Sequence, residues 1–151
     1  MARSTFVYVS YIRTTPEKLW TALTDPVFIK QYWFGMTCES RFETGSPWRL
    51  VSESGELYDE GEIVEAVPAQ RLVIRWRHRR MPELEAEGDS LCTMAIEPDG
   101  GGVKLTITHT VERPESKLIH AVSNGWPKVV SNLKSLLETG AAVINESCGA
   151  T

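Results

Sequence analysis

The sequence has few cysteines and no long hydrophobic run, and each absence excludes a class of protein. Its three cysteines, Cys38, Cys92 and Cys148, include no CxxC pair. They therefore indicate neither a disulfide framework nor a metal cage, and we expect reduced thiols in a cytoplasmic protein. No apolar run approaches the roughly 18 residues that a membrane-spanning helix needs. The first residues contain no apolar core before a cleavage site, so we expect no signal peptide.

A strong excess of charge of one sign is also missing. The 151 residues carry 16 basic and 20 acidic side chains, a formal net charge of −4, which does not indicate nucleic acid as the main partner. Internal repeats and low-complexity tracts are absent. Hydrophobic residues make up 42% and charged residues 24% of the chain, as is typical of a globular domain of this length. We expect one domain over residues 1–140 and a loosely ordered tail over 141–151.

Two short helices are predicted close to the N-terminus. Thr15 precedes Pro16, and Asp25 precedes Pro26. Each pair combines a side chain that can cap a helix with a proline at the first helical position, where a missing N–H costs nothing. The second helix is expected to end at Gly35.

The middle of the chain shows the period of two that is typical of strands. Between residues 37 and 112, apolar and polar residues alternate, and turn residues interrupt the alternation. Antiparallel strands with one buried and one hydrated face produce this pattern. The run Asp99-Gly100-Gly101-Gly102 is a strong hairpin signal. We expect strands over 6–12, 38–42, 48–52, 58–67, 72–78, 92–96 and 103–111.

A single apolar stripe marks the last element. From Leu118 to Leu137, apolar residues recur at spacings of three and four, and Gly140 follows as a stop signal. Pro127 lacks an N–H, which predicts a kink near residues 125–127. Because a sheet with one apolar face must bury that face, the simplest α+β architecture wraps the curved sheet around this helix.

Six motifs follow one another over nearly the whole chain: Thr15–Pro26, Tyr32–Gly35, Gly45–Trp48, Gly61–Ile63, Pro68–Val73 and Gly125–Trp126. With the order of elements, they resemble the START-related superfamily, which has the helix-grip or birch-pollen-allergen-like fold. Within it, the chain is most similar to the family named after the activator of the heat-shock protein 90 ATPase, in its single-domain bacterial form. This resemblance implies an α+β helix-grip fold, with a cavity between helix and sheet that relatives use for lipids, polyketides or other apolar ligands.

The inward phase of the strands and the apolar stripe of the helix select the residues that would surround this cavity. His78 and His109 would either anchor a ligand or be hydrogen-bonded core histidines. The tryptophan rings would either line the cavity or fill it. Trp20 and Trp33 are expected to be core anchors. The candidates for the ligand-binding cavity are Trp48, Trp76, His78, Met94, His109, Trp126 and Val130.

The alternation does not determine which face of the sheet the charged residues of one strand occupy. Glu60 and Glu62 share one strand phase, while Ile63 claims the opposite one. An inward Glu62 would be a costly buried carboxylate and a site candidate, although outward exposure is the commoner outcome. The basic run over residues 71–80 is expected to form a solvated face next to the acidic segment 83–89, and His120 is expected to be solvated.

Together these features favour a module that binds a small apolar or amphipathic ligand without catalysis, by removing its apolar body from water. The sequence contains no GxSxG, HExxH or HxH motif, so we expect no catalytic triad, metal or cofactor. Two other interpretations stay open: a chaperone-linked or stress-response protein-interaction module, and a polyketide cyclase-like enzyme. A large cavity would favour ligand binding or cyclisation, whereas a cavity plugged by tryptophan rings would favour protein interaction.

Overall fold

The computed structural model describes residues 3–144. Within this range the chain forms seven strands and four helices. In chain order these are β1 (Ser4–Ile12), α1 (Pro16–Thr24), α2 (Pro26–Tyr32), β2 (Thr37–Ser40), β3 (Pro47–Val51), β4 (Leu57–Val67), β5 (Arg71–His78), α3 (Pro82–Glu85), β6 (Ser90–Asp99), β7 (Gly102–Val111) and α4 (Lys117–Thr139).

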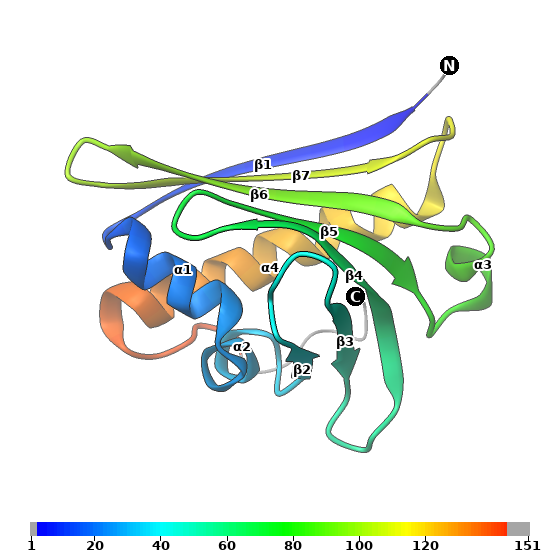
Figure 1. The fold of residues 1–151 in the computed structure, drawn as a ribbon, viewed down its shortest axis with the longest axis horizontal. Coiled ribbons are helices and arrows are strands. Elements are labelled where there is room, and N and C mark those ends of the chain that lie inside the picture. The colour runs from blue at the N-terminus through cyan, green and yellow to red at the C-terminus, as the bar shows by residue number, and fades with distance from the viewer. Residues whose placement is uncertain (1–2, 145–151) are drawn as a thin grey trace.

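The seven strands form one antiparallel sheet in the order β1-β7-β6-β5-β4-β3-β2. The sheet curves around the long helix α4, while α1 and α2 lie together beside one end of it (Figure 1). Only the pairing of β1 with β7 crosses a long stretch of sequence, since the other neighbours follow one another along the chain. The predicted α+β helix-grip architecture is confirmed.

The predicted helix caps are confirmed as well. The Thr15 side chain accepts a hydrogen bond from the Lys18 N–H at 3.2 Å, and Asp25 Oδ1 accepts one from the Val27 N–H at 2.9 Å. Gly140 ends α4 with a positive φ of 91°, a conformation that glycine adopts without steric cost. The helix is continuous across Pro127.

One local prediction was wrong, and one short helix was not predicted. The strand expected over 38–42 ends at Ser40, because Phe42 has a φ of 53° and its N–H bonds to the Ser40 hydroxyl instead of a strand partner. The acidic segment 83–89, for which no helix was predicted, contains part of the short helix α3, whose Leu84 is buried against α4.

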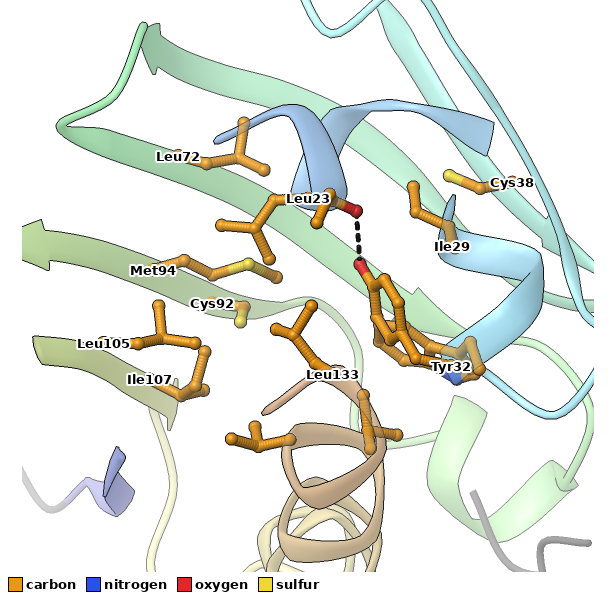
Figure 2. Packing of buried hydrophobic residues seen from close by; sticks show 14 of the residues in the cluster. Leu23, Ile29, Tyr32, Cys38, Leu72, Cys92, Met94, Leu105, Ile107 and Leu133 are labelled. Carbon is orange, nitrogen blue, oxygen red and sulfur yellow. Dashed lines mark hydrogen bonds between the residues drawn. The ribbon is translucent and has the colours of Figure 1, made fainter. Parts of the chain in front are cut away.

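The core lies between α4 and the concave face of the sheet. Figure 2 shows Leu133 of α4 extending toward the side chains of the central strands. In the same view the Tyr32 hydroxyl donates a hydrogen bond of 3.0 Å to the Ala22 carbonyl, which links α2 to α1. Leu133 and Tyr32 are each 2% exposed. None of the helices described is long and apolar enough to cross a membrane.

Asn132 of α4 fastens the residues that follow the helix. Its Oδ1 accepts hydrogen bonds from the N–H groups of Val143 and Ile144 at 2.9 and 2.7 Å. Its amide donates to the Ile144 carbonyl and to the Tyr32 carbonyl. Of the tail expected over 141–151, residues 145–151 lie outside the described residues.

Candidate functional site

The helix–sheet interior contains two tryptophans that meet across a glycine. Trp48 on β3, Gly61 on β4 and Trp76 on β5 are register partners on three neighbouring strands. Because Gly61 has no side chain, the two rings meet, with centroids 4.3 Å apart. A Cβ at position 61 would also overlap the Arg75 carbonyl oxygen. The glycine is therefore what permits this aromatic contact.

Two further tryptophans complete the cluster. The Trp33 ring, which follows α2, lies 6.0 Å from Trp76 and 5.3 Å from Trp126 of α4, centroid to centroid. Trp76 and Trp126 are 5.9 Å apart in an edge-to-face arrangement. Such geometries are favourable for aromatic rings. The four rings join the sheet, α2 and α4 into one packed unit.

His109 is held in this cluster by a complete hydrogen-bond set. The Trp126 indole N–H donates to His109 Nδ1 at 3.1 Å, and His109 Nε2 lies 2.7 Å from the Ser90 hydroxyl. Ser90 donates its own proton to the Trp76 carbonyl, so His109 carries its proton on Nε2. Burial lowers the pKa of His109 to about 4, so the ring is neutral near pH 7. His109 is thus a hydrogen-bonded core histidine.

The main polar residue of the interior, Asp59, was not predicted from the sequence. This residue is 3% exposed, and its Oδ1 accepts a 3.0 Å hydrogen bond from the Trp76 indole N–H. His78 Nδ1 lies 3.0 Å from the same oxygen. Asp59 shares its strand phase with Ile63, which is buried. That shared phase was the available signal, because Ile63 marks the buried face of the strand.

His78 differs from His109 because one of its ring nitrogens has no partner. His78 is 4% exposed, and its Nε2 is buried. Among the described residues it is the one buried side-chain nitrogen or oxygen atom without a hydrogen bond. Buried polar atoms are rarely left in this state, since desolvation without a partner is costly. An additional polar group beside this histidine would remove the cost.

An open pocket of about 340 Å³ reaches Asp59 from outside. It lies between the connection that follows α2 and the turn that joins β3 to β4. Trp33 belongs to the lining of this pocket and also to that of a small interior gap beside Trp76 and Trp126. The expectation that Trp33 is only a core anchor was therefore incomplete. The residues that line the pocket are Trp33, Phe34, Met36, Ser52, Glu53, Ser54, Tyr58 and Asp59.

The seven predicted cavity residues are all buried, and they come together in the interior. None of them lines the open pocket. Two gaps of about 20 Å³ each lie beside the rings within the described residues, one lined by Trp126 and one lined by Trp48 and Met94. A gap of this size holds about one water molecule. The tryptophan rings therefore fill most of the space between helix and sheet.

The outer face of the sheet is charged, as predicted. Glu60 and Glu62 point outward, where Glu60 pairs with Arg79 and Glu62 with Arg75. Arg77 pairs with Asp89 at 2.9 Å, and hydrogen bonding to Asp89 raises the pKa of Arg77. Exposed pairs of this kind contribute little to stability. His120 is exposed, as expected.

The thiols within the described residues are not placed for chemistry. Cys38 and Cys92 are buried, and burial raises the pKa of Cys38 to about 12 and that of Cys92 further. Reactive thiols have lowered pKa values instead. Between residues 3 and 144, no group of three His, Cys, Asp or Glu side chains lies close enough together to hold a metal ion.

Comparison with known proteins identifies a family whose sequence model matches this chain. The sequence model of the family described as "Activator of Hsp90 ATPase homolog 1-like protein" matches residues 13–138. A search of the curated proteins finds no match.

Many solved structures share the fold. Protein MLL2253 from Mesorhizobium loti is 25% identical, with a TM-score of 0.78, and the match covers 89% of this chain and 97% of that one. An HSP90 activator from Plasmodium falciparum is 23% identical, with a TM-score of 0.71 and coverage of 88% and 95%. CalU16 from Micromonospora echinospora is 19% identical, with a TM-score of 0.71 and coverage of 90% and 77%.

Proposed function

We propose that this chain, which belongs to the family of Activator of Hsp90 ATPase homolog 1-like proteins, binds a small amphipathic molecule in the open pocket that ends at Asp59. The observation that carries the proposal is the base of this pocket. There the buried carboxylate of Asp59 lines the pocket and also holds His78, which lies outside the lining and whose Nε2 lacks a partner among the described residues. Specific ligand pockets commonly combine apolar walls with a few convergent polar groups of this kind.

The size of the ligand follows from how the interior is filled. The pocket volume of about 340 Å³ lies near the lower end of the range for small-molecule sites. Behind Trp33 the remaining gaps are about 20 Å³ each. A fatty-acid chain or a flexible polyketide would need the tryptophan rings to move, whereas a one- or two-ring molecule fits the open part.

A neutral two-ring alcohol, 2-naphthalenemethanol, tests the proposal. We expect isothermal titration calorimetry to give a dissociation constant on the order of 100 μM, about −5 kcal/mol. The indole N–H resonance of Trp33 should shift in a ¹H–¹⁵N spectrum, since this ring lines the pocket.

A pair of variants locates the binding. Tyr58→Leu removes a wall of the pocket and should weaken the binding of the alcohol. Tyr8→Leu alters a half-buried aromatic residue of β1 that does not line the pocket, and it should leave the affinity unchanged. Absence of binding by the parent protein, or equal effects of the two variants, would remove the proposal.

The family description and the filled interior favour a second candidate, a protein-interaction module that acts on a chaperone. Addition of the protein to a purified Hsp90 chaperone tests it directly. An increase in the rate of ATP hydrolysis would support this role, and an unchanged rate at saturating protein would count against it.

A further inference from the structure

Carboxylates and aromatic rings lie in the lining of the open pocket, together with the hydroxyls of Ser52 and Ser54. Asp59 and Glu53 contribute carboxylates, and Trp33 and Tyr58 contribute rings. His78 Nδ1 lies 3.0 Å from Asp59 Oδ1, and His78 itself is not among the residues that line the pocket. The two charged side chains of the lining are both carboxylates, which only accept hydrogen bonds when ionised, so a ligand rich in donors would complement them.

Glu53 brings the second carboxylate across the mouth of the pocket. It belongs to the turn between β3 and β4, yet its Oε1 lies against Gly35 of the connection after α2, where a Cβ would clash with it. Gly35 has a φ of 77°, which also favours glycine. The two segments that form the mouth are thus in contact through this carboxylate.

The aromatic wall already receives one cation. The Arg80 guanidinium carbon lies 4.4 Å from the centroid of the Tyr58 ring, a cation–π distance. The lining contains two carboxylates, Asp59 and Glu53, so their negative charges outnumber this one positive charge. The charge of the pocket therefore stays negative, and it opposes the entry of an anion.

We infer that the ligand of this pocket is an organic cation, namely a protonated amine carried on an aromatic or apolar body of one or two rings. The inference rests on the proposed function and names its ligand class. An ammonium group offers only donors, and aromatic faces attract it as well as carboxylates do. A hydroxyl group offers a single donor, and a carboxylate ligand would face Asp59 and Glu53 at close range.

Three probes of similar size and shape but different charge test whether charge determines the affinity. They are 2-(aminomethyl)naphthalene, which is cationic at pH 7, the neutral 2-naphthalenemethanol and the anionic 2-naphthoate. We expect calorimetry to show that the amine binds about tenfold or more tightly than the alcohol, and that the naphthoate binds weakest. The advantage of the amine should shrink as sodium chloride is added, because salt screens charges at the mouth of the pocket.

Matched variants assign the effect to the pocket. Glu53→Gln should lower the affinity for the amine about threefold or more and leave that for the alcohol unchanged. Glu56→Gln removes the same charge from an exposed residue of the same turn that does not line the pocket, so it should change neither. If the Asp59→Asn variant folds, it should lower the affinity for the amine more than Glu53→Gln does. If it does not fold, Glu53→Gln alone tests the role of the carboxylates.

The outcomes separate this inference from the proposed function. If none of the three probes binds, the proposed function fails and the ligand class fails with it. If the alcohol binds as tightly as the amine, the proposed ligand-binding function is supported, but the inference that the ligand is a cation is wrong. If Glu53→Gln and Glu56→Gln weaken the amine equally, the attraction comes from general surface charge, and the assignment to this pocket is overturned.

Discussion

Gly61 is the residue on which the aromatic interior depends. It lies between its register partners Trp48 and Trp76, and a Cβ there would overlap a backbone oxygen that cannot rotate away. We expect Gly61→Ala to lower the free energy of unfolding by about 2 kcal/mol or more, since β4 and β5 must separate. Urea denaturation followed by far-ultraviolet circular dichroism measures this loss.

Val64→Ala serves as the control for this substitution, because Val64 is an exposed residue of the same strand, 41% accessible. It should change stability by less than about 0.5 kcal/mol. Equal stability of Gly61→Ala and the parent protein would show that the two rings do not need the missing side chain.

His109 gives the protein a specific sensitivity to acid. Its pKa falls from 6.5 to about 4 on burial, so the unfolded chain binds the proton first as the pH falls. The contribution of His109 to the free energy of unfolding is therefore fully present above about pH 6.5. It is lost as the pH falls toward 4, by on the order of 3 kcal/mol. Urea denaturation at several pH values tests this. His109→Gln should flatten the curve in this window, and an unchanged slope would contradict the assignment.

At the scale of elements, α4 closes the core. Leu133 lies on its buried face, where it extends toward the central strands (Figure 2), and is 2% exposed. Leu133→Ala should cost about 2–5 kcal/mol, from lost burial and the cavity left behind. Ser131→Ala on the exposed face of the same helix is the control and should cost almost nothing. A loss below about 0.5 kcal/mol for Leu133→Ala in guanidinium denaturation would mean that the helix packs otherwise.

The start of α4 shows why part of the structure could not be predicted from the sequence. Glu87 accepts hydrogen bonds from the Ser116 hydroxyl at 2.5 Å and from the Lys117 N–H at 2.7 Å. Burial acts to raise the pKa of Glu87, but these bonds hold it below its usual value. No contact between the acidic segment 83–89 and a helix was predicted. Its cap on a helix about 30 residues away is a long-range contact that no local pattern contains.

Glu87 also supplies a prediction at this scale. Glu87→Gln should lower the free energy of unfolding by about 1–2 kcal/mol at pH 7, because three donors at the start of α4 lose a charged acceptor. Glu83→Gln, an exposed residue of the same acidic segment, should have no measurable effect. Thermal unfolding would compare the two, and equal midpoints would show that the cap contributes nothing.

For the molecule as a whole, the fold was predictable and the open pocket was not. Alternation along the strands, the two cap-and-proline pairs and the stripe of α4 each depend on neighbouring residues. The pocket depends on two segments that meet only after folding, one carrying Gly35 and the other Glu53. The burial of Asp59 could not be predicted because charged residues occur on both faces of β4. Hydrophobicity alone therefore did not indicate which face of this strand is buried.

The filled interior leads to a prediction about what the architecture can hold. Trp76 contacts Trp33, Trp48, Trp126 and His109, so Trp76→Ala should cost about 3–5 kcal/mol and leave an apolar cavity between sheet and helix. Indole has the shape of the lost ring. We expect it to raise the melting temperature of this variant by mass action and to leave the parent protein, whose interior gaps are about 20 Å³, unchanged.

Trp20→Ala provides the comparison for this experiment, because Trp20 is only partly buried at the edge of the core. Indole should not rescue it, since a partly exposed site collapses or fills with water. Stabilisation of the parent protein by indole at the same concentration would show that the rings open readily. In that case the space between helix and sheet would act as a cavity for apolar ligands, and the recognition site would extend from Asp59 past Trp33 to His109.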